Sequence, residues 1–201
     1  AEAAASAKAV ETAWLLGAPF FIEIVEAAGD GVAHVVAGTA ASAAEGRRLQ
    51  DAAWRWAVPA LADVVVASVG GDPARQTFAD LAAAAACAAR VVQPDGRIIL
   101  LSQTRPDLAA EAETLLRADD ARAALQALSR RPTPEQVPAL RWASAACRAR
   151  ISLLSGLEDD TVEELFATPL HDGGEVQRLL DAGGTILFLD DAHKGLAVVD
   201  E

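Results

Sequence analysis

The sequence lacks several residue patterns that mark common classes of protein. It contains no methionine, three histidines and only two cysteines, Cys87 and Cys147. Each cysteine stands alone in an alanine-rich stretch, with no CxxC pair and no Cys/His cluster near it, so the sequence indicates neither a disulfide framework nor a cysteine-based metal site. We interpret both cysteines as small buried apolar residues.

Targeting and membrane signals are also missing. No basic segment followed by an apolar one opens the chain, and no apolar run reaches the roughly 18 residues that a membrane-spanning helix needs. The formal net charge of −12 repels phosphate backbones,. The arginine pairs at 47–48 and 130–131 are too short to form a basic stripe, and we interpret them as solvated helix faces. We expect a cytoplasmic protein with no nucleic-acid or membrane partner. Because the chain starts at Ala1 without a methionine, we also expect it to be a domain of a longer product.

The pattern of apolar residues predicts an α/β fold. Hydrophobic residues make up 52% of the 201 residues, which is enough for the core of a single domain over residues 1–201,. Continuous apolar runs, typical of strands buried on both faces, alternate with helical stretches. The expected buried strands are 62–69, 97–102, 151–155 and 184–189. The expected helices are 3–16, 39–58, 77–92, most of 106–149, 160–166 and 172–182.

The N-terminal part of the chain carries a different signal. Residues 20–28 and 32–38 are rich in β-forming residues and flank the turn sequence Gly29-Asp30-Gly31, which predicts a hairpin. The complete prediction is therefore an α/β domain with a mixed, mainly parallel sheet, helices on both faces and the hairpin at one edge of the sheet.

The segment Gly70-Gly71-Asp72-Pro73 follows the most apolar strand and precedes a helix. In open α/β sheets, ligands bind beyond the carboxyl ends of the strands. The glycines allow close approach of a ligand, the helix N-terminus offers N–H groups to an anion, and Arg75 can bind a carboxylate through two hydrogen bonds. A plain strand–helix turn, in which the glycines serve geometry alone, is the alternative interpretation.

Motifs of other enzyme classes do not occur. The loop has no Gly-Lys-Ser/Thr of a P-loop and no GxGxxG, and the chain has no GxSxG. The three histidines, His34, His171 and His193, have no metal-ligand spacing. His193 and Lys194 follow the last buried strand, so they can reach the same edge of the sheet as the glycine loop, although an exposed loop explains them equally well.

An ordered set of segments resembles the C-terminal domain of the lactate racemase family, and the resemblance spans most of the chain. These segments are "VVAG" (35–38), "ADVVVASVGGDP" (62–73), "VVQPDGRIILLSQ" (91–103), "LRWASAACRARISLLSGL" (140–157), "ELFATPLHDGGEV" (164–176) and "GGTILFLDDA" (183–192). The resemblance implies an active site between an N-terminal domain and this one. It implies a nickel-pincer nucleotide that accepts a hydride from a 2-hydroxy acid and returns it. The cofactor lysine and the nickel-binding histidines would lie on the N-terminal domain.

The chain departs from the family at several positions. Aligned on the two glycines, the aspartate of the family's loop falls at Arg75, its Tyr-Gln pair at Ala79-Asp80 and its lysine at Ala83. Alanine cannot hydrogen-bond a carboxylate, and Asp80 puts a negative charge where the family has an amide. Trp142 matches a tryptophan of the family, with a core aromatic as the alternative interpretation.

The resemblance implies a lactate-racemase-like domain of a protein that racemises or epimerises a small 2-hydroxy acid. Its partners would be a small-molecule carboxylate and an N-terminal domain or separate partner chain that holds most ligands of the nickel-pincer nucleotide. We expect no metal ligand on this chain and assign no catalytic residue. The residues expected to bind substrate are Gly70, Gly71, Asp72, Arg75, Asp80 and Trp142. The alternative, favoured by Ala79 and Ala83, is a degenerate, non-catalytic domain that binds a small anion or a protein partner.

Overall fold

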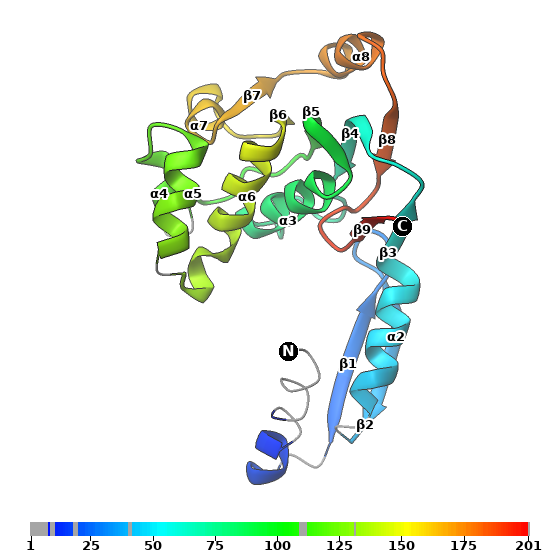
Figure 1. The fold of residues 1–201 in the computed structure, drawn as a ribbon. Coiled ribbons are helices and arrows are strands. Elements are labelled where there is room, and N and C mark those ends of the chain that lie inside the picture. Colours follow the sequence, from blue (N-terminus) through cyan, green and yellow to red (C-terminus); the bar gives the residue numbers. More distant parts are fainter. Residues whose placement is uncertain are drawn as a thin grey trace. The chain divides into compact units, whose positions relative to one another are not determined.

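The computed structural model describes residues 8, 11–17, 20–39, 42–108, 112–130 and 132–200. Packing divides the chain into two compact units, Ala1–Arg55 and Trp56–Glu201. The first contains the hairpin, and the second contains the parallel sheet with its helices (Figure 1). None of the described helices combines the length and the apolar character needed to cross a membrane.

The first unit consists mainly of the hairpin and one helix. Strands β1 (Phe21–Glu26) and β2 (Val32–Gly38) pair antiparallel, and α2 (Ala43–Trp54) packs against them. The Glu23 side chain lies against Gly46 of α2, and Val25, two residues further along the same face of β1, is 4% exposed. The indole of Trp54 donates a hydrogen bond to the Glu26 carbonyl (2.8 Å). The unit is therefore held together by one face of the hairpin.

The second unit is built on five parallel strands in the order β7-β6-β5-β4-β8. Their bounds are β4 (Ala62–Ser68), β5 (Val92–Leu101), β6 (Arg150–Leu154), β7 (Ala167–Leu170) and β8 (Ile186–Leu189). A small separate sheet pairs β3 (Arg55–Val58) with β9 (Leu196–Val199).

Helices cover both faces of the parallel sheet. They are α3 (Phe78–Ala89), α4 (Glu113–Leu116), α5 (Ala121–Arg130), the 3₁₀ turn η2 (Pro134–Gln136), α6 (Val137–Arg148), α7 (Asp159–Glu164) and α8 (Gly173–Asp181). On one face, Val65 and Ile98 share a core with residues of α3 and α6. On the other face, Val64 and Ile99 pack with apolar residues of α8. Four alanines of α3 are fully buried, which allows the close helix packing that an alanine-rich chain requires,.

The α/β class, the mainly parallel sheet, the helices on both faces and the N-terminal hairpin are confirmed. The prediction that the hairpin extends one edge of the parallel sheet was wrong. Within the described residues β1 and β2 pair only with each other, so the five-stranded sheet is parallel throughout rather than mixed. The inner face of the hairpin is buried against α2, and this packing stabilises the hairpin without pairing to the larger sheet.

Three local predictions were wrong. The helix expected through Val58 ends at Trp54, because residues 55–58 pair with β9, about 140 residues later, and the Asp200 N–H donates to the Val58 carbonyl (2.9 Å). Strand β7 was not predicted; its Pro169 weakens the strand signal but is tolerated at a sheet edge,. Residues 106–108 are not helical, and helix begins at Glu113. Residues 3–7, 9 and 10 of the expected first helix lie outside the described residues.

Candidate ligand site at the carboxyl edge of the sheet

Three neighbouring strands end together at one edge of the parallel sheet. Ser68 at the end of β4 is paired with Leu101 at the end of β5, and Ala67 is paired with Leu189 of β8. The segments that follow these strands, 69–77, 102–108 and 190–195, therefore meet at this edge. We call residues 69–77 the glycine loop. Its place at the end of a central strand is where open α/β sheets bind ligands.

Polar side chains of the glycine loop and of the next segment fix the shape of the loop. The Gln76 side-chain amide donates to the Gly70 carbonyl (2.8 Å), and its oxygen accepts from the Ser102 hydroxyl (3.1 Å). The Thr104 hydroxyl donates to the Pro73 carbonyl (3.1 Å), and the Thr104 N–H donates to the Ser102 hydroxyl (3.0 Å). Ser102 and Thr104 are buried. The loop is thus held by internal hydrogen bonds before any ligand arrives.

Asp72 and Arg75 form the exposed tip of the glycine loop. The Asp72 carboxylate accepts a hydrogen bond from the Ala74 N–H (3.0 Å), and its carbonyl accepts one from the Arg75 N–H (3.0 Å). The Asp72 side chain therefore stabilises the turn. Arg75 is exposed at the carboxyl edge of the sheet.

The base of the glycine loop packs on a buried ion pair. Asp191 follows β8 and is 3% exposed, and a Cβ built on Gly70 would overlap its carboxylate. Lys194 is also nearly buried, with its Nζ 4.0 Å from Asp191 Oδ2. Beside them, the Ser68 hydroxyl donates to Asp190 Oδ1 (2.5 Å) and accepts from the Asp191 N–H (3.1 Å). His193 and Lys194 are therefore at the predicted edge, but Lys194 lies beneath its surface.

Two further residues expected to bind substrate have structural contacts. Asp80 closes a capping box at the start of α3: its carboxylate accepts from the Thr77 N–H (2.7 Å) and hydroxyl (2.8 Å). The capping box engages N–H groups that an anion would otherwise use. Trp142 is fully buried, packs against Phe78 with ring centroids 5.6 Å apart and ring planes tilted by 46°, and donates from Nε1 to the Leu165 carbonyl (2.6 Å). The structure thus gathers Gly70, Gly71, Asp72 and Arg75 in one loop and places Trp142 in the core.

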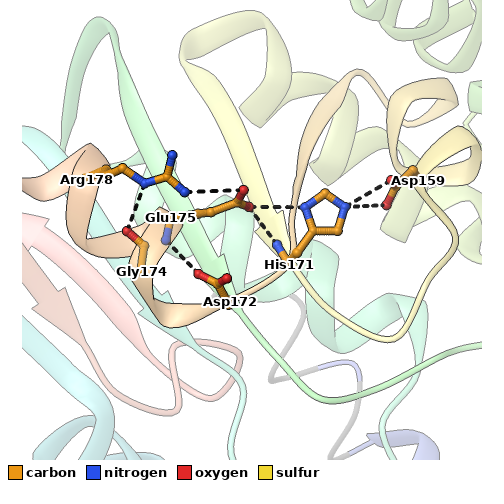
Figure 2. A network of polar contacts seen from close by, with 6 residues as sticks. All are labelled: Asp159, His171, Asp172, Gly174, Glu175 and Arg178. Carbon is orange, nitrogen blue, oxygen red and sulfur yellow. Dashed lines mark hydrogen bonds and ion pairs between the residues drawn. The ribbon is translucent and has the colours of Figure 1, made fainter.

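A second polar cluster lies at the end of edge strand β7 (Figure 2). His171 Nε2 is 3.0 Å from Asp159 Oδ2, and His171 Nδ1 is 3.2 Å from Glu175 Oε2. These two carboxylates raise the pKa of His171 above its ordinary value, that of Asp159 most strongly. The His171 N–H and imidazole in turn lower the pKa of Glu175. The Asp172 side chain accepts from the Glu175 N–H (2.9 Å) and caps α8.

This cluster links two helices but does not form a metal site. Asp159 begins α7 and Glu175 lies in the first turn of α8, and they approach opposite sides of the imidazole ring. Within the part of the chain that the structure describes, no three His, Cys, Asp or Glu side chains are grouped to hold one metal ion.

The two cysteines differ in their burial. Cys87 is buried, as predicted, and burial raises the pKa of its thiol. Cys147 is exposed, so the prediction that it is buried was wrong.

Two sets of hydrogen-bonded side chains were not predicted from the sequence. Gln76 and Ser102 lie 26 positions apart, and nothing in their local patterns indicates that they meet. The spacing of four between His171 and Glu175 was a usable signal, but the 12-residue separation of His171 from Asp159 was not,.

The structure superposes on that of the lactate racemase apoprotein from Thermoanaerobacterium thermosaccharolyticum with a TM-score of 0.73 and 17% identity, over 91% of this chain and 46% of that one. The chain has a lactate-racemase-like fold. It also superposes on a protein from Thermotoga maritima with a TM-score of 0.62 and 11% identity, over 90% of this chain and 49% of that one. No protein-family model and no curated protein matches the sequence.

These matches confirm the resemblance to lactate racemase at the level of the fold. The chain spans about half the length of each solved structure. At 17% and 11% identity the likeness extends to the backbone architecture alone.

Proposed function

We propose that this chain is the lactate-racemase-like half of a protein that acts on a small 2-hydroxy acid, and that the glycine loop forms one wall of the substrate site. The observation that carries the proposal is the place of this loop. It follows the central strand β4 at the carboxyl edge, in a chain whose lactate-racemase-like fold extends over 91% of its length,.

Arg75 is the residue that we assign to the substrate carboxylate. A guanidinium can hold a carboxylate through two parallel charge-assisted hydrogen bonds, and Arg75 lies at the exposed tip of the loop,. Gly70 and Gly71 let the backbone approach the substrate, and Gly71 has the positive φ of 92° that a side chain rarely tolerates,. Asp72 shapes the turn that presents Arg75.

The described residues do not fit the nickel-pincer nucleotide as its anchor. They offer no group of three metal-binding side chains. His171 has a carboxylate beside each ring nitrogen, and Lys194 is nearly buried against Asp191. If racemisation or epimerisation uses this cofactor, we assign the residues that hold it to a domain or partner chain outside the part described. This chain would then contribute substrate binding and closure of the site.

A second candidate function is a non-catalytic domain that binds a small anion or a protein partner. Asp80 favours the protein partner of this alternative, because its carboxylate is engaged in the capping box of α3 beside the loop, where its negative charge opposes any anion. Ala79 and Ala83 supply no polar group at the positions where the family has tyrosine and lysine. The two candidates differ in whether the 2-hydroxyl group of a ligand is recognised.

The proposal is tested by calorimetric titration of the native gene product with two acids. One is lactate, and the other is propionate, a carboxylate that lacks the 2-hydroxyl group. We expect lactate to bind more tightly than propionate. Arg75→Ala should weaken lactate binding by about 10- to 100-fold, because it removes a charge-assisted hydrogen bond. Arg117→Ala removes the same charge from α4, where Arg117 pairs with Glu113, and should leave binding unchanged. Equal affinity for both acids would favour simple anion binding. No binding of either would contradict the proposal.

A further inference from the structure

The outer face of the hairpin is apolar and exposed. Four large side chains define this hairpin face: Ile22 (65% exposed), Ile24 (61%), Val32 (59%) and Val35 (62%). Ile24 is paired directly with Val35, and Ile22 with Ala37. The irregular register beyond Val25 pairs Val32 with Glu26, which brings Val32 onto the same face. The four side chains are therefore contiguous across both strands.

The two faces of the hairpin contrast in their packing. On the inner face, Glu23 lies against α2 and Val25 is buried. On the outer face, Glu26 is the only charged residue among the paired positions that alternate with the inner ones. Single exposed apolar side chains are common on soluble proteins, but a contiguous patch of β-branched residues marks an interaction surface. A two-stranded sheet is also only marginally stable without further cover.

We infer that the hairpin face is the docking surface for the domain that completes the lactate-racemase-like fold, on the same polypeptide or on a separate chain. The chain accounts for 46% and 49% of the two solved structures, while about nine tenths of its own length is matched in each. About half of each solved structure therefore has no counterpart in this chain, and in the whole protein proposed above that half must contact this one. The surface of the other domain that packs on the hairpin face should be mainly apolar, because Glu26 is the only charged residue among the paired positions on this side of the hairpin.

This inference rests on the proposed function only for the existence of the missing half. Among the described residues of the second unit, three of the four exposed large apolar side chains are less exposed than those of the hairpin face. The four are Val137 (37%), Ile186 (39%), Phe188 (65%) and Leu196 (37%). Of these four side chains, Phe188 alone is as exposed as those of the hairpin face. It is therefore the matched position for control variants.

Hydroxyl-radical footprinting read by mass spectrometry tests the inference. The 201-residue chain and the native gene product from the source cells are labelled at equal radical dose. We expect the oxidation of Ile22, Ile24, Val32 and Val35 to fall severalfold in the native product. Undiminished oxidation there, or a native product with the mass of this chain and no co-purifying chain, would overturn the inference. Protection in the isolated chain that grows with its concentration would identify a second copy as the occupant and also overturn it.

A variant provides the second test. The double change Ile24→Thr and Val35→Thr keeps the β-propensity of both strands while removing apolar surface. In the native product it should release the other domain to limited proteolysis, or the other chain on gel filtration, whereas Phe188→Thr should not. If lactate binds but the hairpin face is unprotected, the docking inference alone fails. If the face is protected and lactate does not bind, the substrate assignment alone fails.

Discussion

Gly70 and Asp191 lie so close together that position 70 has no room for a side chain beside the carboxylate of Asp191. One residue follows β4 and the other follows the neighbouring strand β8. Asp191 is buried and paired with the nearly buried Lys194, and its backbone has a positive φ of 49°. Gly70 therefore has a structural role that is independent of any ligand.

Replacing Gly70 with alanine should destabilise the protein. The added methyl group must displace a buried, paired carboxylate, and overpacking of this kind costs about 1–3 kcal/mol of unfolding free energy. Urea denaturation followed by circular dichroism measures the change. Gly173→Ala is the matched control, because a Cβ there meets nothing within 4 Å. An equal stability of the two variants would show that Asp191 moves aside freely.

Asp80 should contribute to stability through the capping box of α3. Asp80→Ala removes the acceptor of the Thr77 N–H and hydroxyl and should cost about 0.5–2 kcal/mol of unfolding free energy,. Asp80→Asn keeps an acceptor oxygen but removes the charge, so its loss should be smaller. The same two variants titrated with lactate separate the roles of cap and charge. Tighter lactate binding by Asp80→Asn, with little loss of stability, would show that the negative charge opposes the ligand.

Trp142 should act as a core residue. Trp142→Phe removes the Nε1 donor, leaves the buried Leu165 carbonyl without that hydrogen bond, and should cost about 1–3 kcal/mol of unfolding free energy,. The affinity for lactate should not change. Trp54→Phe removes a similar indole hydrogen bond at a more exposed position and should cost less. Weakened lactate binding by Trp142→Phe, beyond that caused by Trp54→Phe, would instead support the substrate role predicted from the sequence.

The cluster around His171 should make stability depend on pH. The carboxylates of Asp159 and Glu175 raise the pKa of His171 above 6.5. The contribution of His171 to the stability of the fold is therefore fully present below pH 6.5 and is lost as pH rises through the raised pKa. The lowered pKa of Glu175 adds a contribution that is present above 4.5 and is lost as pH falls through the lowered value. The stability advantage of the wild type over His171→Asn should therefore be largest between these two ordinary values.

Urea denaturation of the wild type and His171→Asn across this pH range measures that advantage. An NMR titration of the His171 ring protons gives the pKa directly, and Asp159→Asn should lower it. An advantage of the wild type that grows above pH 6.5 would contradict the assignment.

Local patterns in the sequence were sufficient for the main elements of the fold. Residues 62–69 and 97–102 are continuous apolar runs, and both become central strands because such runs can only be buried on both faces,. The turn at 29–31 predicted the hairpin because its glycines permit the reversal. In contrast, β3 and β9 are four residues each and depend on pairing across the length of the chain, which no local pattern records.

The sequence by itself determined the α/β class, the glycine loop at the end of β4 and the absence of a polar side chain at Ala79 and Ala83. These follow from the identity and local order of residues, which set backbone preference and hydrogen-bonding capacity. Only the tertiary structure decided that Asp191 packs on Gly70, that Trp142 is buried and that one hairpin face is left uncovered. Each of these depends on which surfaces meet when distant segments pack, and burial is a property of that packing rather than of the residue,.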